Sequence, residues 1–189
     1  TLYSGNKSQS IQVLNDSVIN KNKTSLSSLL NYNSVLYFKE YGRGMLSTVS
    51  FRGTTASQTA VIWNGINVKS QHNGSADFNT YTAPEFNTIS IKAGVGSVSY
   101  GSGAIGGTIH LNNEFSFNKG FKNNLFWEYG SFNTSNTFVK SAYSNDKLSV
   151  KVSGNFVKSD NNYEVSEKDY LNLNGQYNNR TFNLGAAYK

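Results

Sequence analysis

The sequence predicts an α+β domain followed by antiparallel strands of a transmembrane β-barrel. From about Phe121 onward, apolar and polar residues alternate with period two, which is typical of strands that have one apolar and one polar face. The residues before Phe121 lack this regularity and contain most of the glycines and the only proline, Pro84. We therefore place the first domain at residues 1–113 and the barrel strands at residues 114–189.

The composition excludes several classes of protein. Aromatic residues make up 14% of the chain, more than a disordered protein would have. The formal net charge is +6, but the lysines are scattered singly, which indicates a solvated surface rather than one that binds nucleic acid. Without cysteine, the chain forms neither disulfides nor thiolate metal sites. No run of about 18 apolar residues predicts a transmembrane helix, and a β-barrel would not require one.

The first domain is expected to combine one helix with short strands. Residues 25–30 are predicted to form a helix that begins after Thr24 as its N-cap and places its leucines on one face. The short apolar runs Thr59–Trp63 and Thr88–Lys92 predict strands. Together these elements indicate a small domain with glycine-rich loops.

Five strands are predicted in the second half of the chain. They span residues 123–131, 137–144, 148–158, 170–177 and 181–189. Tight turns at Asn145–Lys147 and Asn178–Arg180, with a longer polar loop at Ser159–Asp169, give the asymmetry that is typical of outer-membrane barrels. A soluble sheet with one wet face would show the same alternation. Five open strands cannot close a barrel, so we expect them to belong to a longer chain.

Gly101–Gly106 matches the G-x-G-x-x-G pattern of dinucleotide-binding loops. Such a loop requires a helix after it and an acidic residue about 20 positions later. The run that follows, Gly107–Leu111, favours a strand, and Phe126 stands where the acid would be. We therefore expect a turn between strands, whose glycines provide positive φ angles and close backbone approach.

No catalytic arrangement of side chains is evident. His72 and His110 are far apart in the sequence and have no cysteine or acid at metal-ligand spacing. No catalytic triad or carboxylate pair stands out, so we expect no enzymatic activity and no required cofactor. A group of acids in one polar loop leaves two interpretations open, a solvated loop, which is more common, or a Ca²⁺ site with oxygen ligands. These acids are Asp160, Glu164, Glu167 and Asp169.

Four motifs, in order along the chain, resemble those of the plug domains of TonB-dependent receptors. Ser27–Val35 is similar to the leading helix and turn of the plug, and Val49–Gly53 to an apolar-Arg-Gly motif. Val61–Asn67 resembles an apolar-Asp-Gly-Val segment, and Ser97–Leu111 resembles the segment that closes the plug. The resemblance covers nearly the whole chain, because alternating strands follow the plug in this family.

Within the family, the resemblance is strongest to the cobalamin (vitamin B12) branch, through Ala56-Ser57 and Asn73–Asp77. The chain departs from the family pattern where Asn64 replaces the usual aspartate and Asn33-Ser34 the usual Pro-Gly turn. Arg52 is retained, but its usual charged partners within the plug are not. A buried arginine without a carboxylate is costly, so the resemblance implies that Arg52 contacts the barrel.

The resemblance implies a receptor of the bacterial outer membrane that takes up a scarce, bulky nutrient such as cobalamin or a siderophore. A plug would gate a barrel of about 22 strands, with its N-terminus in the periplasm and a TonB-type energy-transducing protein as partner. Apical plug loops would contact the nutrient through amide, hydroxyl and ammonium donors. The expected ligand-binding residues are Thr54, Thr55, Ser57, Gln58, Lys69, Gln71, His72 and Asn73.

Two other functions stay open. A receptor-like barrel could serve as a structural or assembly partner of other outer-membrane proteins, and no TonB box is recognisable near Thr1. A soluble carbohydrate-binding β-sandwich would also show alternation, but it leaves the Tyr100–Gly107 motif unexplained. Uptake therefore remains the favoured interpretation.

Overall fold

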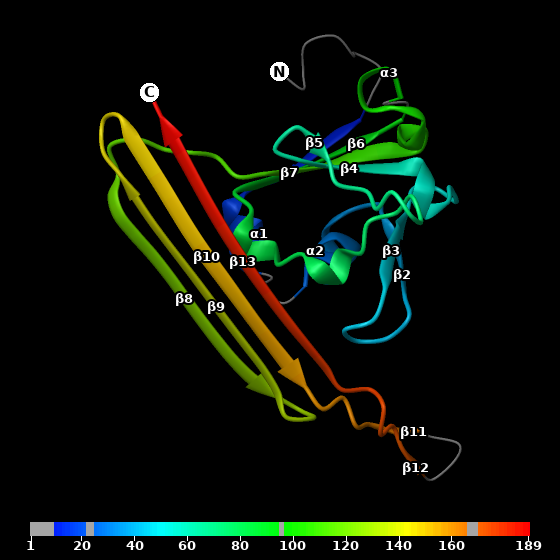
Figure 1. The fold of residues 1–189 in the computed structure, drawn as a ribbon. Helices are drawn as coiled ribbons and strands as arrows, with labels where there is room; N and C mark the ends of the chain where they lie inside the picture. Colours follow the sequence, from blue (N-terminus) through cyan, green and yellow to red (C-terminus); the bar gives the residue numbers. More distant parts are fainter. Residues whose placement is uncertain (1–9, 22–24, 95–96, 166–169) are drawn as a thin grey trace. The chain divides into compact units, whose positions relative to one another are not determined.

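The computed structural model describes residues 10–21, 25–94, 97–165 and 170–189. The chain divides into two compact units, one ending at Glu114 and the other beginning at Phe115 (Figure 1). The first unit is an α+β domain and the second is an antiparallel sheet, which confirms the predicted fold class.

A five-stranded sheet organises the first unit. Its order is β1-β6-β7-β4-β5, with β4 and β7 parallel and the other neighbours antiparallel. The strands are β1 (Ile11–Leu14), β4 (Thr59–Trp63), β5 (Ile66–Asn67), β6 (Thr88–Ala93) and β7 (Gly107–Asn112). Both short strands predicted from apolar runs, β4 and β6, are therefore confirmed.

Two α-helices pack against the core of this unit. α1 spans Asp16–Lys21 and α2 spans Leu26–Asn33, and the leucines of α2 are fully buried, as their spacing predicts. The helix cap differs from the prediction. The Ser25 hydroxyl accepts a hydrogen bond from the Ser28 amide (3.1 Å), while the predicted cap, Thr24, lies outside the described residues.

Short elements complete the first unit. A separate hairpin consists of β2 (Tyr37–Glu40) and β3 (Ser47–Ser50). The remaining helices are α3 (Ser97–Tyr100) and the 3₁₀ helices η1 (Ala56–Gln58), η2 (Phe78–Thr80), η3 (Ala83–Glu85) and η4 (Ser102–Ala104). Across the described ranges, no helix has both the length and the apolar character needed to cross a bilayer.

The residues of β4 are buried on both faces of the sheet, which explains why β4 reads as a continuous apolar run. The main core lies on one face, where Ile109 pairs with both Val61 and Ile91. Ala60 and Ile62 point to the opposite face and pack with a residue of the glycine-rich turn, Ala104. The two parallel strands β4 and β7 are therefore buried on both faces, at the centre of the sheet.

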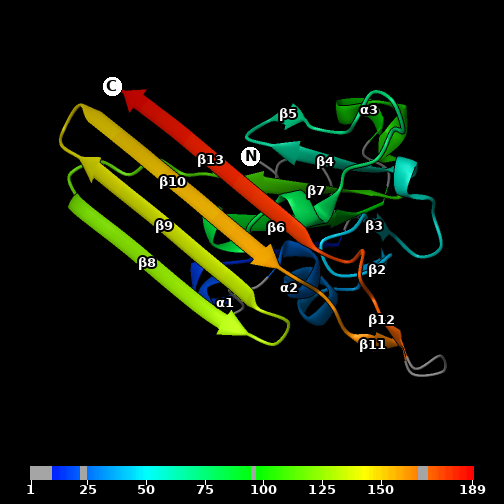
Figure 2. The same ribbon diagram turned by 60° about the horizontal axis from the view of Figure 1, so that its bottom comes forward.

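The second unit is a four-stranded antiparallel sheet with the order β13-β10-β9-β8. Its strands lie side by side in both views (Figures 1 and 2). They are β8 (Gly120–Gly130), β9 (Thr134–Ser144), β10 (Leu148–Ser159) and β13 (Tyr177–Tyr188). Each has 11 or 12 residues, close to the roughly 9–11 that a tilted transmembrane strand requires.

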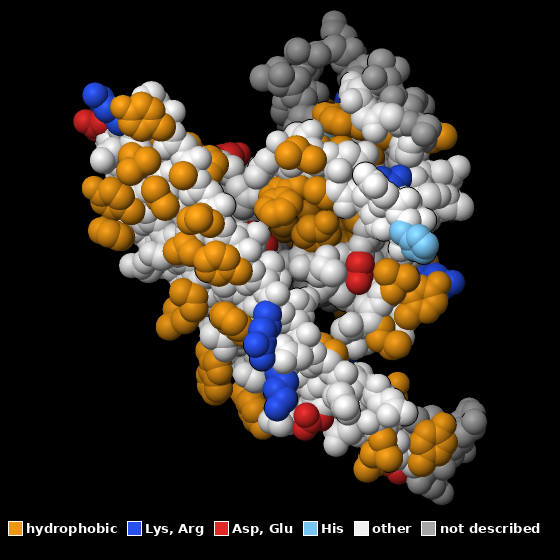
Figure 3. Space-filling view, in the orientation of Figure 1, with side chains coloured by type: hydrophobic (Ala, Val, Ile, Leu, Met, Phe, Trp, Pro, Cys, Tyr) orange, Lys and Arg blue, Asp and Glu red, His pale blue; other side chains and the backbone are white. Residues whose placement is uncertain are grey.

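The two faces of this sheet differ in polarity. On one face Leu125 pairs with Val139 and Val152 pairs with Leu184, and all four side chains are exposed. Ser153, the neighbour of Val152 in sequence, points to the other face, as period-two alternation requires. Apolar side chains gather along this sheet in the space-filling view (Figure 3).

The prediction of five strands is wrong, because one strand replaces the last two. Residues 172–176 contain a turn, and only Tyr170–Leu171 pair, as β12, with β11 (Glu164–Val165). Asn178–Arg180, which were predicted to form a turn, lie inside β13 and pair with Phe156–Lys158 of β10. The long β10–β13 ladder overrides the turn preference of the two asparagines.

Candidate functional site

The two parallel strands of the first unit bring two glycine-rich or polar segments together. The chain enters β4 from the loop at residues 54–58 and enters β7 from the turn at residues 101–107, and β4 and β7 run side by side. The Gly106 amide donates a hydrogen bond to the Gln58 carbonyl (2.9 Å) and joins the two segments directly. We call them the 54–58 loop and the glycine turn.

The glycine turn shows the two roles predicted for its glycines. Gly101 has a φ of 88° in the left-handed region, where other residues are strained. A β-carbon at Gly107 would lie 2.7 Å from the Lys92 carbonyl and 2.8 Å from the Phe51 ring. Residues 103–106 begin no α-helix and lead into β7. The local structure therefore lacks the helix N-terminus that a dinucleotide site needs.

Side chains of the 54–58 loop are engaged to different degrees. The Thr54 hydroxyl accepts a hydrogen bond from the Phe51 amide (3.2 Å), and the Gln58 side-chain oxygen accepts one from the Thr55 amide (3.0 Å). Thr54 and Gln58 therefore shape the loop. The hydroxyls of Thr55 and Ser57 lie 3.0 Å apart on exposed residues, so these two are better placed to meet a ligand.

The second segment with predicted ligand-binding residues, residues 69–76, folds back on itself and is called the 69–76 loop. The Ser70 amide donates to the Ser75 carbonyl (3.0 Å), and the Gly74 amide donates to the Ser70 carbonyl (2.9 Å). These bonds hold the tip of the loop in a tight turn. The predicted ligand-binding residues at this tip are all exposed, and they are Gln71, His72 and Asn73.

Lys69 connects the 69–76 loop to both other segments. Its ammonium group donates a hydrogen bond to the Ser57 carbonyl and one of 3.3 Å to the Gly103 carbonyl. Partial burial lowers the pKa of Lys69 from its usual value. The structure thus brings all of the predicted ligand-binding residues into one region of the first unit, although they have different surroundings.

Sequence reasoning missed the tip of the β2–β3 hairpin, which contacts the segment directly after the 69–76 loop. Tyr41 and Met45 are exposed there, at 54% and 58%. The segment after the loop holds the hairpin, because the Asp77 carboxylate accepts from the Ser47 amide (3.0 Å) and Asn79 donates to the Met45 carbonyl. Glycines at 42 and 44, between two strand-like segments, are the signal that predicts such a tip.

Arg52 does not lie within a strand. It follows β3 in a turn, with a φ of 45°, between the buried Phe51 and Gly53, and its side chain is exposed. Among the described residues no hydrogen bond or ion pair engages its guanidinium group. Its predicted contact with the barrel stays a prediction.

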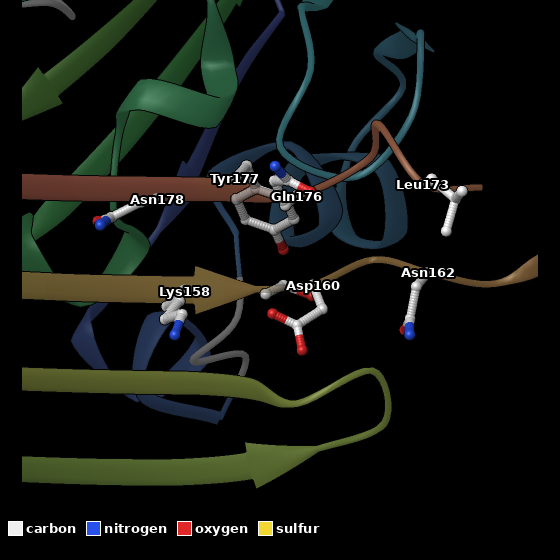
Figure 4. A pocket seen from close by; sticks show the side chains of 8 residues that line it. Lys158, Asp160, Asn162, Leu173, Gln176, Tyr177 and Asn178 are labelled. Atoms are coloured by element: carbon white, nitrogen blue, oxygen red, sulfur yellow. The ribbon is translucent and has the colours of Figure 1, made fainter. Parts of the chain in front are cut away.

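A cavity of about 570 Å³ lies in the second unit, where β10 ends and β13 begins. In Figure 4, Lys158, Asp160 and Asn162 lie along the end of β10 and the residues after it. Gln176 and Tyr177 lie across from them, where β13 begins. The Asp160 carboxylate accepts a hydrogen bond from the Asn133 amide group (3.2 Å) in the β8–β9 turn. Most of the lining residues carry polar groups, and Leu173 and the Tyr177 ring add apolar surface.

The predicted Ca²⁺ site falls only partly within the described residues. Glu167 and Asp169 lie outside them, and Asp160 and Glu164 remain. In the described ranges no group of three metal-binding side chains comes together. Calcium binding in this loop therefore stays a prediction.

Residues 5–108 match the TonB-dependent receptor plug domain family. A vitamin B12 transporter, BtuB of Vibrio vulnificus YJ016, is 29% identical over 147 residues, which cover 76% of this chain and 23% of the transporter. BtuB of Vibrio cholerae O395 is 36% identical over 70 residues, covering 37% of this chain and 12% of the transporter. The chain thus spans less than a quarter of the curated relatives' length.

Solved receptor structures share the fold. The copper transporter OprC matches 95% of this chain and 28% of its own, with a TM-score of 0.77 and 18% identity. The siderophore receptor PirA of Acinetobacter baumannii matches 79% of this chain and 24% of its own, with a TM-score of 0.61 and 18% identity. The pyoverdine outer-membrane receptor FpvA of Pseudomonas aeruginosa PAO1 matches 80% of this chain and 22% of its own, with a TM-score of 0.65 and 15% identity. At these identities the likeness concerns the fold alone.

Proposed function

Because the chain belongs to the TonB-dependent receptor plug domain family, we propose that it forms the plug and the first barrel strands of a nutrient receptor in the bacterial outer membrane. The matched relatives are transporters and receptors, not enzymes. The β8–β13 sheet supports the barrel assignment through its exposed apolar face and the length of its strands. In this proposal the plug gates the barrel lumen, and a TonB-type protein supplies the energy.

The proposed nutrient is cobalamin, and the observation that carries this choice is the sequence similarity to a vitamin B12 transporter over 76% of the chain. The chemistry of the site is compatible with it. Hydroxyl, amide and imidazole groups of the 54–58 and 69–76 loops suit a large polar ligand, and Tyr41 and Met45 add apolar contact area. A ferric siderophore has the same needs, so it is the competing ligand to test.

The first experiment measures binding of cyanocobalamin and of a ferric catecholate siderophore to the intact receptor in detergent. Saturable binding of cyanocobalamin, together with loss of cobalamin-dependent growth on gene deletion, is the expected result. Binding of the siderophore alone would replace the proposed nutrient. If neither binds and other outer-membrane proteins co-purify in fixed ratio, the receptor-like assembly role is favoured instead.

A second experiment locates the site with paired variants. Gln71→Ala combined with His72→Ala removes two exposed side chains of the 69–76 loop and is expected to weaken binding about tenfold, the value of one or two hydrogen bonds. The matched control combines Ser17→Ala with Lys21→Ala on the exposed side of α1. Equal affinities of the two double variants would place the nutrient elsewhere.

A further inference from the structure

Lys69 links three segments of the plug that are far apart in the sequence. Its ammonium group donates to the carbonyls of Ser57 and Gly103. Its own amide donates to the Asn67 side chain (3.2 Å), and Asn67 in turn donates to the Tyr100 carbonyl (3.4 Å). One side chain therefore holds both predicted ligand loops against the glycine turn.

Gly103 is the residue type that this contact requires. A β-carbon at position 103 would fall on the Lys69 ammonium group and would lie 3.0 Å from the Ser57 carbonyl. The backbone of Gly103 does not have a left-handed φ. Close approach of the lysine, rather than backbone conformation, thus explains the glycine at this position.

We propose that Lys69 is a positioning residue that latches the two ligand loops to the glycine turn, and that it shapes the nutrient site without contacting the nutrient. The role in nutrient binding rests on the proposed function. The latch itself is a property of the plug and does not depend on which ligand binds. A lysine ammonium has three donors, and two of them are used by main-chain carbonyls. The ammonium group is partly buried, which lowers the pKa of Lys69.

The latch has a clear physical consequence for binding. Hydrogen bonds from a charged donor are stronger than neutral ones, and these two act on segments that flank exposed ligand-facing side chains. Loops that are fixed before the nutrient arrives lose less conformational entropy when it binds. Loss of the ammonium group should therefore loosen all three segments together and weaken nutrient affinity, while the sheet remains intact.

The test compares Lys69→Met, which keeps the length of the side chain, with Lys69→Arg, which keeps the donors, in the intact receptor. Amide hydrogen exchange is measured without any ligand. Lys69→Met should raise exchange in residues 54–58 and 101–107 by about tenfold, while β6 is unchanged and Lys69→Arg restores most of the protection. Lys21→Met, on an exposed residue of α1, is the control for loss of one positive charge.

A second variant disrupts the same contact by changing the other residue, Gly103. Gly103→Ala places a methyl group where the ammonium group lies, so it should loosen the same segments. Because both substitutions remove one contact, the double variant should exchange no faster than the faster single variant. Additive effects, control-like exchange in Lys69→Met, or faster exchange throughout the plug would each overturn the latch.

Binding of cyanocobalamin then tests the latch and the proposed nutrient independently. If cyanocobalamin binds the wild type, Lys69→Met should raise its dissociation constant about tenfold, and Lys69→Arg should bind nearly as well as the wild type. Wild-type affinity in a Lys69→Met receptor with loosened loops would refute the positioning role. If cyanocobalamin does not bind the wild type, the nutrient assignment fails, and the exchange measurements still decide whether the latch exists.

Discussion

His110, in β7, is a buried histidine whose surroundings favour its neutral form. Its side chain is 5% exposed, its Nε2 atom lies 3.0 Å from the Thr108 hydroxyl, and its ring meets the Tyr100 ring edge-on at 5.1 Å. Burial lowers the pKa of His110, and the positive charge of Lys92 lowers it further. The folded plug therefore binds a proton at this position less readily than the unfolded chain does.

This difference predicts that the plug loses stability on acidification. An unfolded histidine has a pKa of about 6.5, so the stability contributed by neutral His110 is complete above that pH and falls below it, toward the lower pKa of the folded state. His110→Gln keeps a hydrogen-bonding side chain but does not titrate, and it should flatten the decline between about pH 7 and pH 5. Pulse proteolysis of the intact receptor in urea measures the effect; equal pH dependence of wild type and variant would contradict it.

At the scale of single residues, the sequence indicates which donors lie in the loops but not which are already engaged. Thr54, Gln58 and Lys69 were expected to contact a ligand, yet each one bonds to the plug itself. That outcome depends on contacts between residues far apart in the chain, such as Lys69 with Gly103. Exposure of the 71–73 tip follows more directly from its local turn chemistry.

The strands of the second unit expose apolar side chains on one face, and the barrel assignment makes that face the one in contact with lipid. Leu125, in the middle of β8, is 73% exposed there, while the adjacent Asn124 points to the opposite face. Leu125→Lys should reduce folding into liposomes by about 2–4 kcal/mol, the cost of a lysine near the bilayer midplane. Asn124→Lys is the matched control. Folding is measured by gel mobility. If the two variants fold equally well, this face does not contact lipid.

The turns of the sheet lead to a prediction about its orientation in the membrane. The Asn145–Lys147 turn lies at one end of the sheet, and the β10–β13 connection lies at the other. The β10–β13 connection is much longer than the other two, and long loops face the exterior in such barrels, so Asn162→Cys should be labelled on intact cells and Asp146→Cys should not. This chain contributes no cysteine of its own. The reverse labelling pattern would invert the proposed orientation.

The predicted turn at Asn178–Arg180 does not lie at the same end of the sheet as the Asn145–Lys147 turn. Asn179 lies in β13 opposite Val157 of β10, at the same end of the sheet as the long loop. Periodicity predicted the strands well because alternation persists for 11 or 12 residues. It failed where asparagines lie inside a ladder, and it missed α1, whose six residues are too short for a helical period to emerge.

The two units of the molecule place their large apolar side chains differently. The first unit places large side chains such as Phe51, Phe78 and Ile109 inside its core. The second places Trp127, Phe182 and other large side chains on an exposed face. A hydrophobic content of 37% is low for a protein with a single large core. It is sufficient when one small core is combined with a sheet whose apolar face contacts lipid.

Arg52 provides the most direct test of how a plug of this kind is held in its barrel. A residue other than glycine at a φ of 45° costs about 1–2 kcal/mol in backbone strain. Glycine would relieve that strain, so the sequence retains arginine at a cost. The exposed guanidinium group has no partner among the described residues of this chain. The predicted partner is a barrel carboxylate, as the family resemblance implies.

Arg52→Gly in the intact receptor separates the two explanations for this residue. If Arg52 is an ordinary surface charge, glycine should stabilise the turn by about 1 kcal/mol and leave nutrient uptake unchanged. If it pairs with the barrel, the substitution strands a carboxylate at a cost of about 3–5 kcal/mol for a buried pair. The plug should then become protease-sensitive and uptake should fall, although barrel insertion is normal. Arg52→Lys should recover only part of the uptake, because an ammonium lacks the planar, two-pronged geometry of a guanidinium group.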